Sequence, residues 1–160
     1  MIVVSDTGPL AYLISIELSE SLPQLYGDVY LPPTVYEELA HPQSPVCDWI
    51  ASPPAWIKVV APEILLSDAR LDQGEREAIS LALEMNADGV LIDEQRGRNV
   101  ARNLGLKIAG TLAVIVDGHA KELFDGVAAL DRLAATNFYA SAELLDEVKR
   151  ALAQHAKKPR

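Results

Sequence analysis

The sequence predicts an α/β fold of three layers, in which helices cover both faces of a five-stranded parallel sheet. Two observations support this class. Short apolar segments alternate with segments of helical periodicity along the chain, as in folds built on a parallel sheet. The expected strands are nearly all apolar, and no Asn-Gly pair joins two of them as a hairpin. Such strands are typical of a sheet that is buried on both faces.

The chain begins with a strand, a turn and a helix. The first strand, Ile2–Val4, is β-branched, and Pro9 then stands at an early helical position, where proline is tolerated. Apolar residues follow at helical spacing, namely Leu10, Leu13 and Ile14.

The next two strands are each followed by an expected helix. Val29–Leu31 precedes a helix that starts at Val35, and Trp56–Val60 precedes a helix from about Gln73 to Met85. The proline-rich stretch 42–54 is expected to be a connecting loop.

The last two strands complete the sheet. Val90–Ile92 leads to a helix over residues 96–104, which Gly105 is expected to close. Lys107–Ala109 is a short strand before a helix that starts at Leu112. Five strands therefore alternate with helices.

The remainder of the chain is expected to be helical. We predict a single domain over residues 1–160, with a core of about 1–123 and a C-terminal helical segment of about 124–156, and we expect the tail 157–160 to fray. The last helix, over 141–155, carries an apolar stripe that either packs on the protein's own core or binds a partner. The stripe consists of Leu144, Leu145, Val148 and Leu152.

Composition narrows the class of function. Cys47 is the only cysteine, which suits a reducing cytoplasm. No apolar run approaches the ~20 residues that cross a bilayer, so we expect a cytoplasmic protein with no membrane partner. The net charge of −9 argues against broad, passive binding to nucleic acid. It leaves room for a nuclease whose acids are neutralised by metal.

Two aspartates follow expected strands directly. Asp6 comes after the first strand and Asp93 after the fourth. In open parallel sheets, ligands bind beyond the carboxyl ends of the strands, where the strand order reverses. Capping of the following helix is an equally good interpretation of either residue alone.

Two glutamates extend this set. Thr34 and Glu37 have the spacing of a capping box, which leaves the adjacent Glu38 free to face the sheet edge. Glu75 shares the inward stripe of its helix with Ala78, Ile79, Ala82 and Leu83, and Glu77 does not. Alternatively, Asp72 caps this helix and Glu75 is the third-position acid of that cap.

Four carboxylates suit a hard divalent cation such as Mg²⁺ or Mn²⁺, which could activate water for phosphodiester hydrolysis. The nearby segment 94–107 carries four basic residues against one acid, Glu94. We expect it either to contact phosphate or to be an ordinary solvated helix surface. The candidate phosphate contacts are Arg96, Arg98 and Arg102.

Four segments that contain these acids occur in order: Ser5–Thr7, Val35–Leu39, Gly74–Ile79 and Leu91–Arg98. Together with Gly110–Leu112 they resemble the PIN-domain family, over Met1 to about Leu123. The most similar form is the branch of predicted prokaryotic PIN-like nucleic-acid-binding proteins, many of which neighbour antitoxin genes. The helical C-terminal segment is similar as well.

The resemblance implies a PIN-like fold with an acidic pocket for Mg²⁺ or Mn²⁺. It also implies an endoribonuclease, often the VapC-type toxin of a toxin–antitoxin pair, with RNA as substrate. An antitoxin protein and a second copy of the chain are the candidate protein partners. The family's catalytic and metal-binding acids correspond to Asp6, Glu38, Glu75 and Asp93. Thr7 and Thr111 correspond to secondary polar contacts. The third acid is often Asp in characterised ribonucleases of the family, and Glu75 reaches one methylene further.

Three other functions compete with this interpretation. An aspartic protease would place its Asp-Thr-Gly in an antiparallel fold, which the pattern contradicts. A phosphorylatable receiver domain would want a paired acid after the first strand and a Lys after the last, whereas Asp6 is single and Lys107 precedes its strand. A noncatalytic PIN-fold module that binds nucleic acid or protein is the main alternative.

Overall fold

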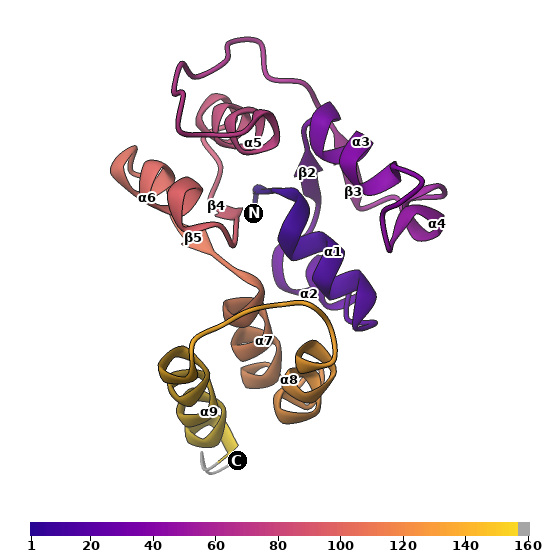
Figure 1. Ribbon diagram of the computed structural model, residues 1–160, viewed down its shortest axis with the longest axis vertical. Helices are drawn as coiled ribbons and strands as arrows, with labels where there is room; N and C mark the ends of the chain where they lie inside the picture. Colours follow the sequence, from indigo (N-terminus) through magenta and orange to yellow (C-terminus); the bar gives the residue numbers. More distant parts are fainter. Residues whose placement is uncertain (157–160) are drawn as a thin grey trace. The chain divides into compact units, whose positions relative to one another are not determined.

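The order of the strands determines where this chain can place a site. The computed structural model describes residues 1–156 and, within them, a five-stranded sheet in the order β3-β2-β1-β4-β5 (Figure 1). All of its strand pairs are parallel, which confirms the predicted class. The strands are β1 (Val3–Ser5), β2 (Val29–Leu31), β3 (Ile57–Val59), β4 (Gly89–Leu91) and β5 (Ile108–Ala109).

The central strand β1 pairs with β2 on one side and with β4 on the other. The chain builds outward from β1 to β3 in one direction and then returns to add β4 and β5 in the other, so the order reverses between β1 and β4. Asp6 follows β1, and its backbone N–H donates to the carbonyl oxygen of Leu91 in β4 at 2.9 Å. The carboxyl ends of these two strands therefore lie side by side.

Helices form a layer on each face of the sheet. Because crossovers between parallel strands are right-handed, the helices between β1 and β3 lie on one face and those between β3 and β5 on the other. Figure 1 shows α1 and α2 on one side of the strands and α5 and α6 on the other, which confirms the three layers. These helices are α1 (Thr7–Ser15), α2 (Ser21–Tyr26), α3 (Pro33–Ala40), α4 (Cys47–Ile50), α5 (Gln73–Glu84) and α6 (Gln95–Asn103).

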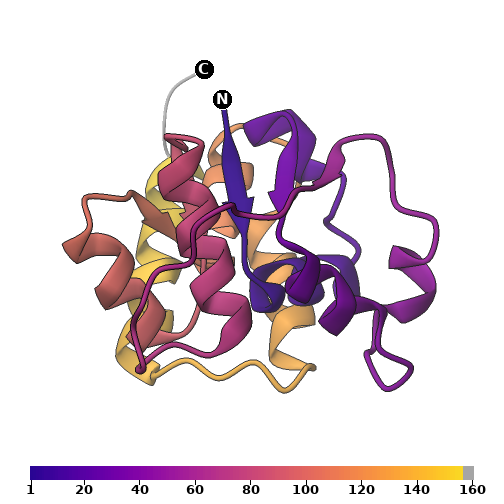
Figure 2. The ribbon, with the colours of Figure 1, turned by 90° about the horizontal axis from the view of Figure 1, so that it is seen from above.

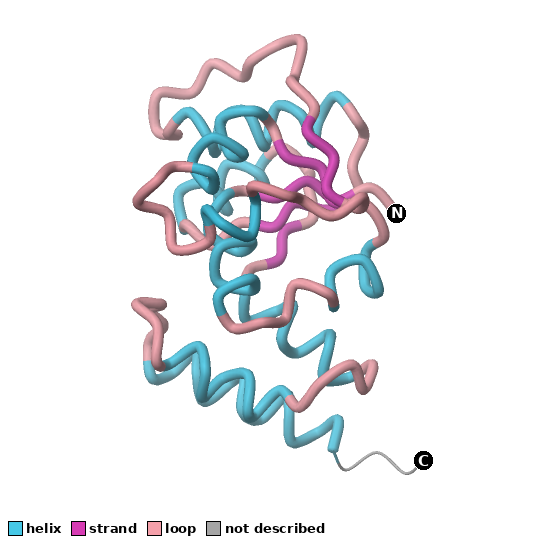
Figure 3. The backbone as a smooth tube through the Cα atoms, turned by 90° about the vertical axis from the view of Figure 1, so that its right-hand side faces the viewer, coloured by secondary structure: helices cyan, strands magenta, loops and turns pink. Residues whose placement is uncertain are grey.

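The connections differ in length and content. β1 leads directly into α1 (Figure 2), as expected. The stretch 42–54, predicted to be a loop, contains the single helical turn α4. The connection 60–72 between β3 and α5 has neither helix nor strand (Figure 3). α6 ends before Gly105, whose φ of 83° is left-handed and suits glycine, so the predicted helix end is confirmed.

The helix α5 packs its apolar face on the sheet, in contact with β1 and β4. Three residues predicted for this face, Ala78, Ile79 and Ala82, are fully buried together with Val4. The prediction for Leu83 is wrong, because this residue lies in the last turn of the helix and is 40% exposed.

A second compact unit begins after Thr111. It contains most of α7 (Thr111–Ala120), with α8 (Gly126–Ala134) and α9 (Ala142–Ala156). Leu152 of α9 packs on α8, where a Cβ on Gly126 would lie 2.5 Å from its Cδ2 atom. Part of the predicted apolar stripe is thus used inside the protein: Val148 and Leu152 are buried, whereas Leu144 is exposed.

Two expectations about the chain as a whole stay predictions. One is a single domain over residues 1–160, and the other is the frayed tail 157–160, which lies outside the described residues. Within residues 1–156, no helix combines the length and the apolar character needed to cross a membrane.

Candidate active site

Asp6 is a buried acid at the carboxyl edge of the sheet. It occupies the N-cap position of α1, yet its carboxylate makes no capping hydrogen bond, and its side chain is only 7% exposed. Burial raises the pKa of Asp6 to about 7; the backbone N–H of Thr7 opposes this rise, and the negative charges of Asp72, Glu75 and Glu38 add to it. The geometry therefore does not support the capping interpretation of Asp6.

Glu38 reaches the same place from α3. Its Oε2 atom accepts a hydrogen bond from the hydroxyl of Thr7 in α1. Gly74, in the first turn of α5, lies against both carboxylates: a Cβ at this position would lie 3.0 Å from Glu38 Oε1 and 3.5 Å from Asp6 Oδ1. The absence of a side chain at Gly74 lets three elements, α1, α3 and α5, meet at these carboxylates.

The predicted capping box of Thr34 and Glu37 is wrong. α3 already begins at Pro33, with Pro32 as an N-cap that makes no side-chain bond. Proline fits the first helical position because its missing N–H would have no partner there. Thr34 therefore lies inside the helix, and its hydroxyl donates to Glu77 of α5, whereas Glu37 is exposed.

Glu75 takes the role that the alternative interpretation assigned to it. The N–H of Glu75 donates to Asp72 Oδ1 at 2.8 Å, and the N–H of Asp72 donates to Glu75 Oε1 at 3.2 Å, which completes a capping box. The inward orientation of Glu75 is confirmed too, since it is 1% exposed. Its other oxygen, Oε2, is buried without a hydrogen-bond partner among the described residues.

The environment of Glu75 raises its pKa. Burial is the largest cause; the Asp72 N–H lowers the pKa, the Asp72 charge raises it, and the charge of Arg96 lowers it. The unpartnered Oε2 faces α6, where a Cβ on Gly97 would lie 2.5 Å away. One oxygen of Glu75 is thus used for the cap and the other remains available.

Asp93 is held by a different partner. Thr111 donates to it twice, through its N–H to Oδ1 and through its hydroxyl to Oδ2, each at 2.7 Å. Burial raises the pKa of Asp93, and the two Thr111 bonds and the charge of Arg98 lower it. A Cβ on Gly8 would lie 3.4 Å from Asp93 Oδ2, so the start of α1 borders Asp93 as well as Glu38.

The three candidate phosphate contacts separate along α6. Arg96 lies in the first turn, near enough to Glu75 to affect its pKa. Arg98 donates from Nη1 to the carbonyl oxygen of Ile92 at 3.0 Å. Arg102 lies in the last turn, roughly 9 Å further along the axis than Arg96 at 1.5 Å per residue. Only Arg96 and Arg98 border the acids.

Two acids of this region were not among the predicted site residues. Asp72 is exposed, yet its negative charge raises the pKa of Asp6 more than the charge of Glu75 or of Glu38 does. Glu77 is buried at 7% exposure against Thr34. The helical period of α5 places Glu77 away from the sheet, and nothing in the local sequence reveals that α3 covers it there.

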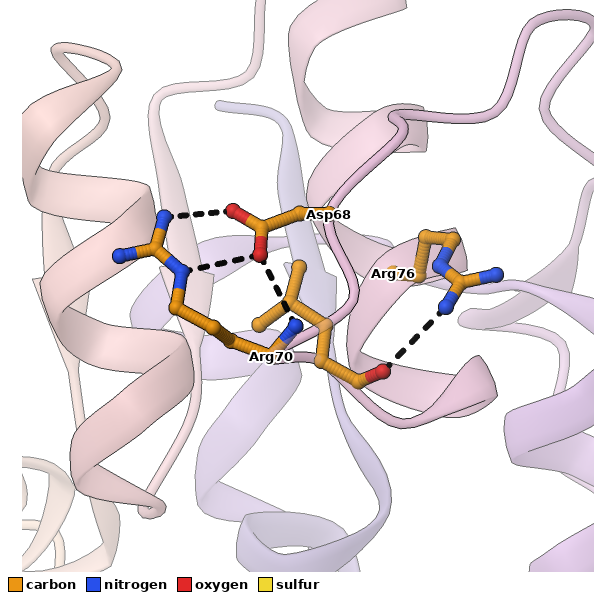
Figure 4. Close-up of polar contacts among 4 residues, drawn as sticks. Asp68, Arg70 and Arg76 are labelled. Carbon is orange, nitrogen blue, oxygen red and sulfur yellow. Dashed lines mark hydrogen bonds and ion pairs between the residues drawn. The ribbon is translucent and has the colours of Figure 1, made fainter.

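Two side-chain contacts hold the loop that leads into α5, close to Asp72. Asp68 and Arg70 form an ion pair at 2.6 Å, and Arg76 donates from Nη2 to the carbonyl oxygen of Leu71 at 3.4 Å (Figure 4). The Arg70 bonds lower the pKa of Asp68 to about 2. Because Arg70 is largely exposed, we expect this pair to order the loop more than to stabilise the fold.

The acids do not form a ready metal cluster. Among residues 1–156, no group of three or more His, Cys, Asp or Glu side chains is arranged so that it could hold a metal ion. Asp93 directs both oxygens to Thr111, and Glu75 directs one to Asp72. The donor chemistry nevertheless fits a hard divalent cation, which prefers carboxylate oxygens. Within residues 1–156, Glu75 Oε2 has no hydrogen-bond partner, and the carboxylate of Asp6 is buried near Glu38.

Comparison with known proteins gives one match. A family model described as a PIN domain matches residues 2–154, which is nearly the whole chain. No curated protein matches, and no solved structure matches.

The raised pKa of Asp6 predicts a pH-dependent cost to folding. Below pH 4 both the folded and the unfolded chain hold this proton, so its contribution is small. Between pH 4 and about 7 the unfolded chain ionises first, which destabilises the fold by ~1–4 kcal/mol at higher pH. In EDTA, Asp6→Asn should therefore be more stable than wild type at pH 8 and nearly equal at pH 4. Urea unfolding across this range measures the difference, with the exposed Asp146→Asn as control. Equal stability at pH 8 would contradict the burial of an ionisable Asp6.

The capping box of α5 predicts different stabilities for two substitutions of Asp72. Asn retains an oxygen that can accept from the Glu75 N–H and removes the charge near Asp6, so Asp72→Asn should be neutral or stabilising in EDTA. Asp72→Ala also removes the cap and should be less stable than Asp72→Asn by about 0.5–2 kcal/mol. Thermal unfolding of both variants at pH 7 measures this. If the Ala and Asn variants melt together, Asp72 does not cap α5.

Proposed function

The chain belongs to the PIN-domain family, whose fold is of nuclease type, and on that basis we propose that it is a metal-dependent endoribonuclease that hydrolyses RNA phosphodiesters. The observation that carries the proposal is the pair of Asp6 and Glu38, which meet at Gly74 beside the carboxyl end of β1. A buried acid whose neighbours are acids favours a bound cation over a purely structural role.

The residues that would hold Mg²⁺ or Mn²⁺ are Asp6 and Glu38, with Glu75 Oε2 and Asp93 as the further carboxylates. The chemistry supplied by such an ion is activation of a water nucleophile and screening of the negative charge on the phosphate. Thr7 orients the Glu38 carboxylate, and Thr111 orients that of Asp93. The burial of Asp6 limits the access of bulk water to its carboxylate.

The substrate would approach along the start of α6. Arg96 and Arg98 border the acids there and would contact the phosphates of a single RNA strand. Arg102, in the last turn, would contact RNA only if the strand continued along the helix. Because the net charge is −9, RNA would bind at this basic segment and not over the protein surface as a whole.

Within this proposal the enzyme is the toxin of a toxin–antitoxin pair in the cytoplasm. The resemblance to VapC-type toxins supports this role, and an antitoxin protein and a second copy of the chain are the proposed partners. The exposed apolar side chains Val127, Tyr139 and Leu144 of the C-terminal helical unit are available for such contacts.

A noncatalytic PIN-fold binding module is the second candidate function. It is favoured by the observation that, in the described part of the chain, no three suitable side chains are arranged to hold a metal ion. In that case the acids would serve the fold, as Glu75 does in its capping box, and the surface would bind a partner without cleaving it.

Cleavage of a mixed RNA pool with Mn²⁺ or with EDTA distinguishes the two functions. The wild type should cleave only with metal. Glu38→Gln should lower the rate roughly 100-fold or more, because even outer partners of metal ligands are worth about 10–100-fold. Its neighbour Glu37 lies about 100° around the same helix from Glu38, and Glu37→Gln should cleave like the wild type. No cleavage by any variant with Mn²⁺ would favour the binding module. Equal losses in both variants would contradict the assignment of Glu38.

A further inference from the structure

The described hydrogen bonds between α3 and α5 include one that joins two side chains behind the site. The hydroxyl of Thr34 in α3 donates to Oε2 of Glu77 in α5. Glu77 is 7% exposed, so this acidic residue lies almost wholly inside the protein. Burying a carboxylate is costly unless hydrogen bonds satisfy it, so this pair is a specific feature of the α3–α5 packing.

The pair lies on the face of α3 that carries Glu38. Thr34 and Glu38 are four residues apart in the helix, and side chains at this spacing share one face. Glu38 itself accepts from Thr7 of α1 and borders Gly74 of α5. One face of α3 therefore makes two hydrogen bonds, one turn apart. Thr34 bonds to Glu77 of α5, and Glu38 bonds to Thr7 of α1.

Glu77 is separate from the acids that face Asp6. The carboxylates whose charges raise the pKa of Asp6 are Asp72, Glu75 and Glu38. Glu75 and Glu77 are two residues apart on α5, so they lie on different sides of the helix. Glu75 points toward α6 and Glu77 toward α3.

A role in positioning explains a polar pair in this place better than a role in stability. Replacing both members of a buried hydrogen-bonded pair by apolar groups of similar shape is often nearly neutral for stability. A hydrogen bond, however, has a preferred direction and length, so it fixes how α3 is rotated and how far it is shifted along α5. Apolar contacts alone define these two quantities less sharply.

We propose that Glu77 is a positioning residue: by accepting from Thr34 it fixes the rotation of α3 and thereby places the Glu38 carboxylate beside Asp6. This rests on the proposed function, because it assigns Glu38 to the reactive site. Glu77 touches neither substrate nor metal in this account, and it acts only through α3.

The test separates position from stability with a set of matched variants. Thr34→Val removes the hydroxyl, and Thr34→Ser retains it. Thr34→Val/Glu77→Met replaces the whole pair by apolar side chains and should fold as well as the wild type. Thr136→Val is the control, because Thr136 also donates a hydroxyl hydrogen bond, to the carbonyl oxygen of Leu133 at 2.6 Å, in the C-terminal helical unit.

Three measurements are made on each variant: the Mn²⁺ dissociation constant by calorimetry, kcat and KM for RNA cleavage, and the ¹³C NMR signal of the Glu38 carboxyl, which reports its bond to Thr7. Thr34→Val and the double variant should each weaken Mn²⁺ binding and lower kcat about tenfold, at the low end of the effect of outer partners of metal ligands. KM for RNA should not change, and the Glu38 signal should move. Thr34→Ser and Thr136→Val should match the wild type.

A folded double variant with wild-type Mn²⁺ affinity, kcat and Glu38 signal would overturn the proposal. So would losses that follow the stability of the variants, including that of Thr136→Val. If the wild type binds no Mn²⁺ and cleaves no RNA, the proposed function fails, and the Glu38 signal alone decides the inference. A signal that moves in Thr34→Val and not in Thr34→Ser supports positioning, and a signal that stays in place contradicts it.

Discussion

The reversal of strand order between β1 and β4 is the constraint on which the rest of the structure depends. It places the carboxyl ends of two central strands side by side and sends the helices that follow them, α1 and α6, to opposite faces of the sheet. Asp6 and Asp93 stand at these two ends. The first turn of α5 then lies between α3 and α6, where Gly74 borders Asp6 and Glu38, and Gly97 borders Glu75.

Crowding of carboxylates at this edge is offset by neutral hydrogen-bond donors. An unpaired negative charge in a buried place is costly, and a hydroxyl or N–H that donates to it reduces the cost. The acids held in this way are Glu38 by Thr7, Glu77 by Thr34, Asp93 by Thr111 and Glu75 by the N–H of Asp72. Among the described residues Asp6 accepts no hydrogen bond from a side chain; the N–H of Thr7 is its donor, and burial raises its pKa to about 7. We therefore regard Asp6 as the residue with most to gain from a bound cation.

Periodicity was enough to predict the sheet, most of the helices and three of the acids, but not the short helices α2 and α4. Asp6 and Asp93 follow apolar strands, and Glu75 shares the inward face of Ala78 and Ile79, so local patterns locate all three. Contacts between distant segments were not predictable in this way. The bond from Thr34 to Glu77 depends on how α3 packs against α5. Because α3 begins at Pro33, Thr34 lies inside the helix and does not cap it, although its spacing from Glu37 suggested a capping box. The bonds of Thr111 to Asp93 likewise join two segments that are distant in sequence, because Asp93 follows β4 and Thr111 follows β5.

The central claim is that Asp6 is a buried acid poised for a divalent cation, and the pH titration of its carboxyl by ¹³C NMR tests it most directly. In EDTA the midpoint should lie near pH 7, where burial and neighbouring acids place the pKa of Asp6. Saturating Mg²⁺ should move the midpoint down by more than one unit, because a cation nearby favours the ionised form. A midpoint near the ordinary value of ~3.9 in EDTA, or one that Mg²⁺ leaves unchanged, would contradict the account.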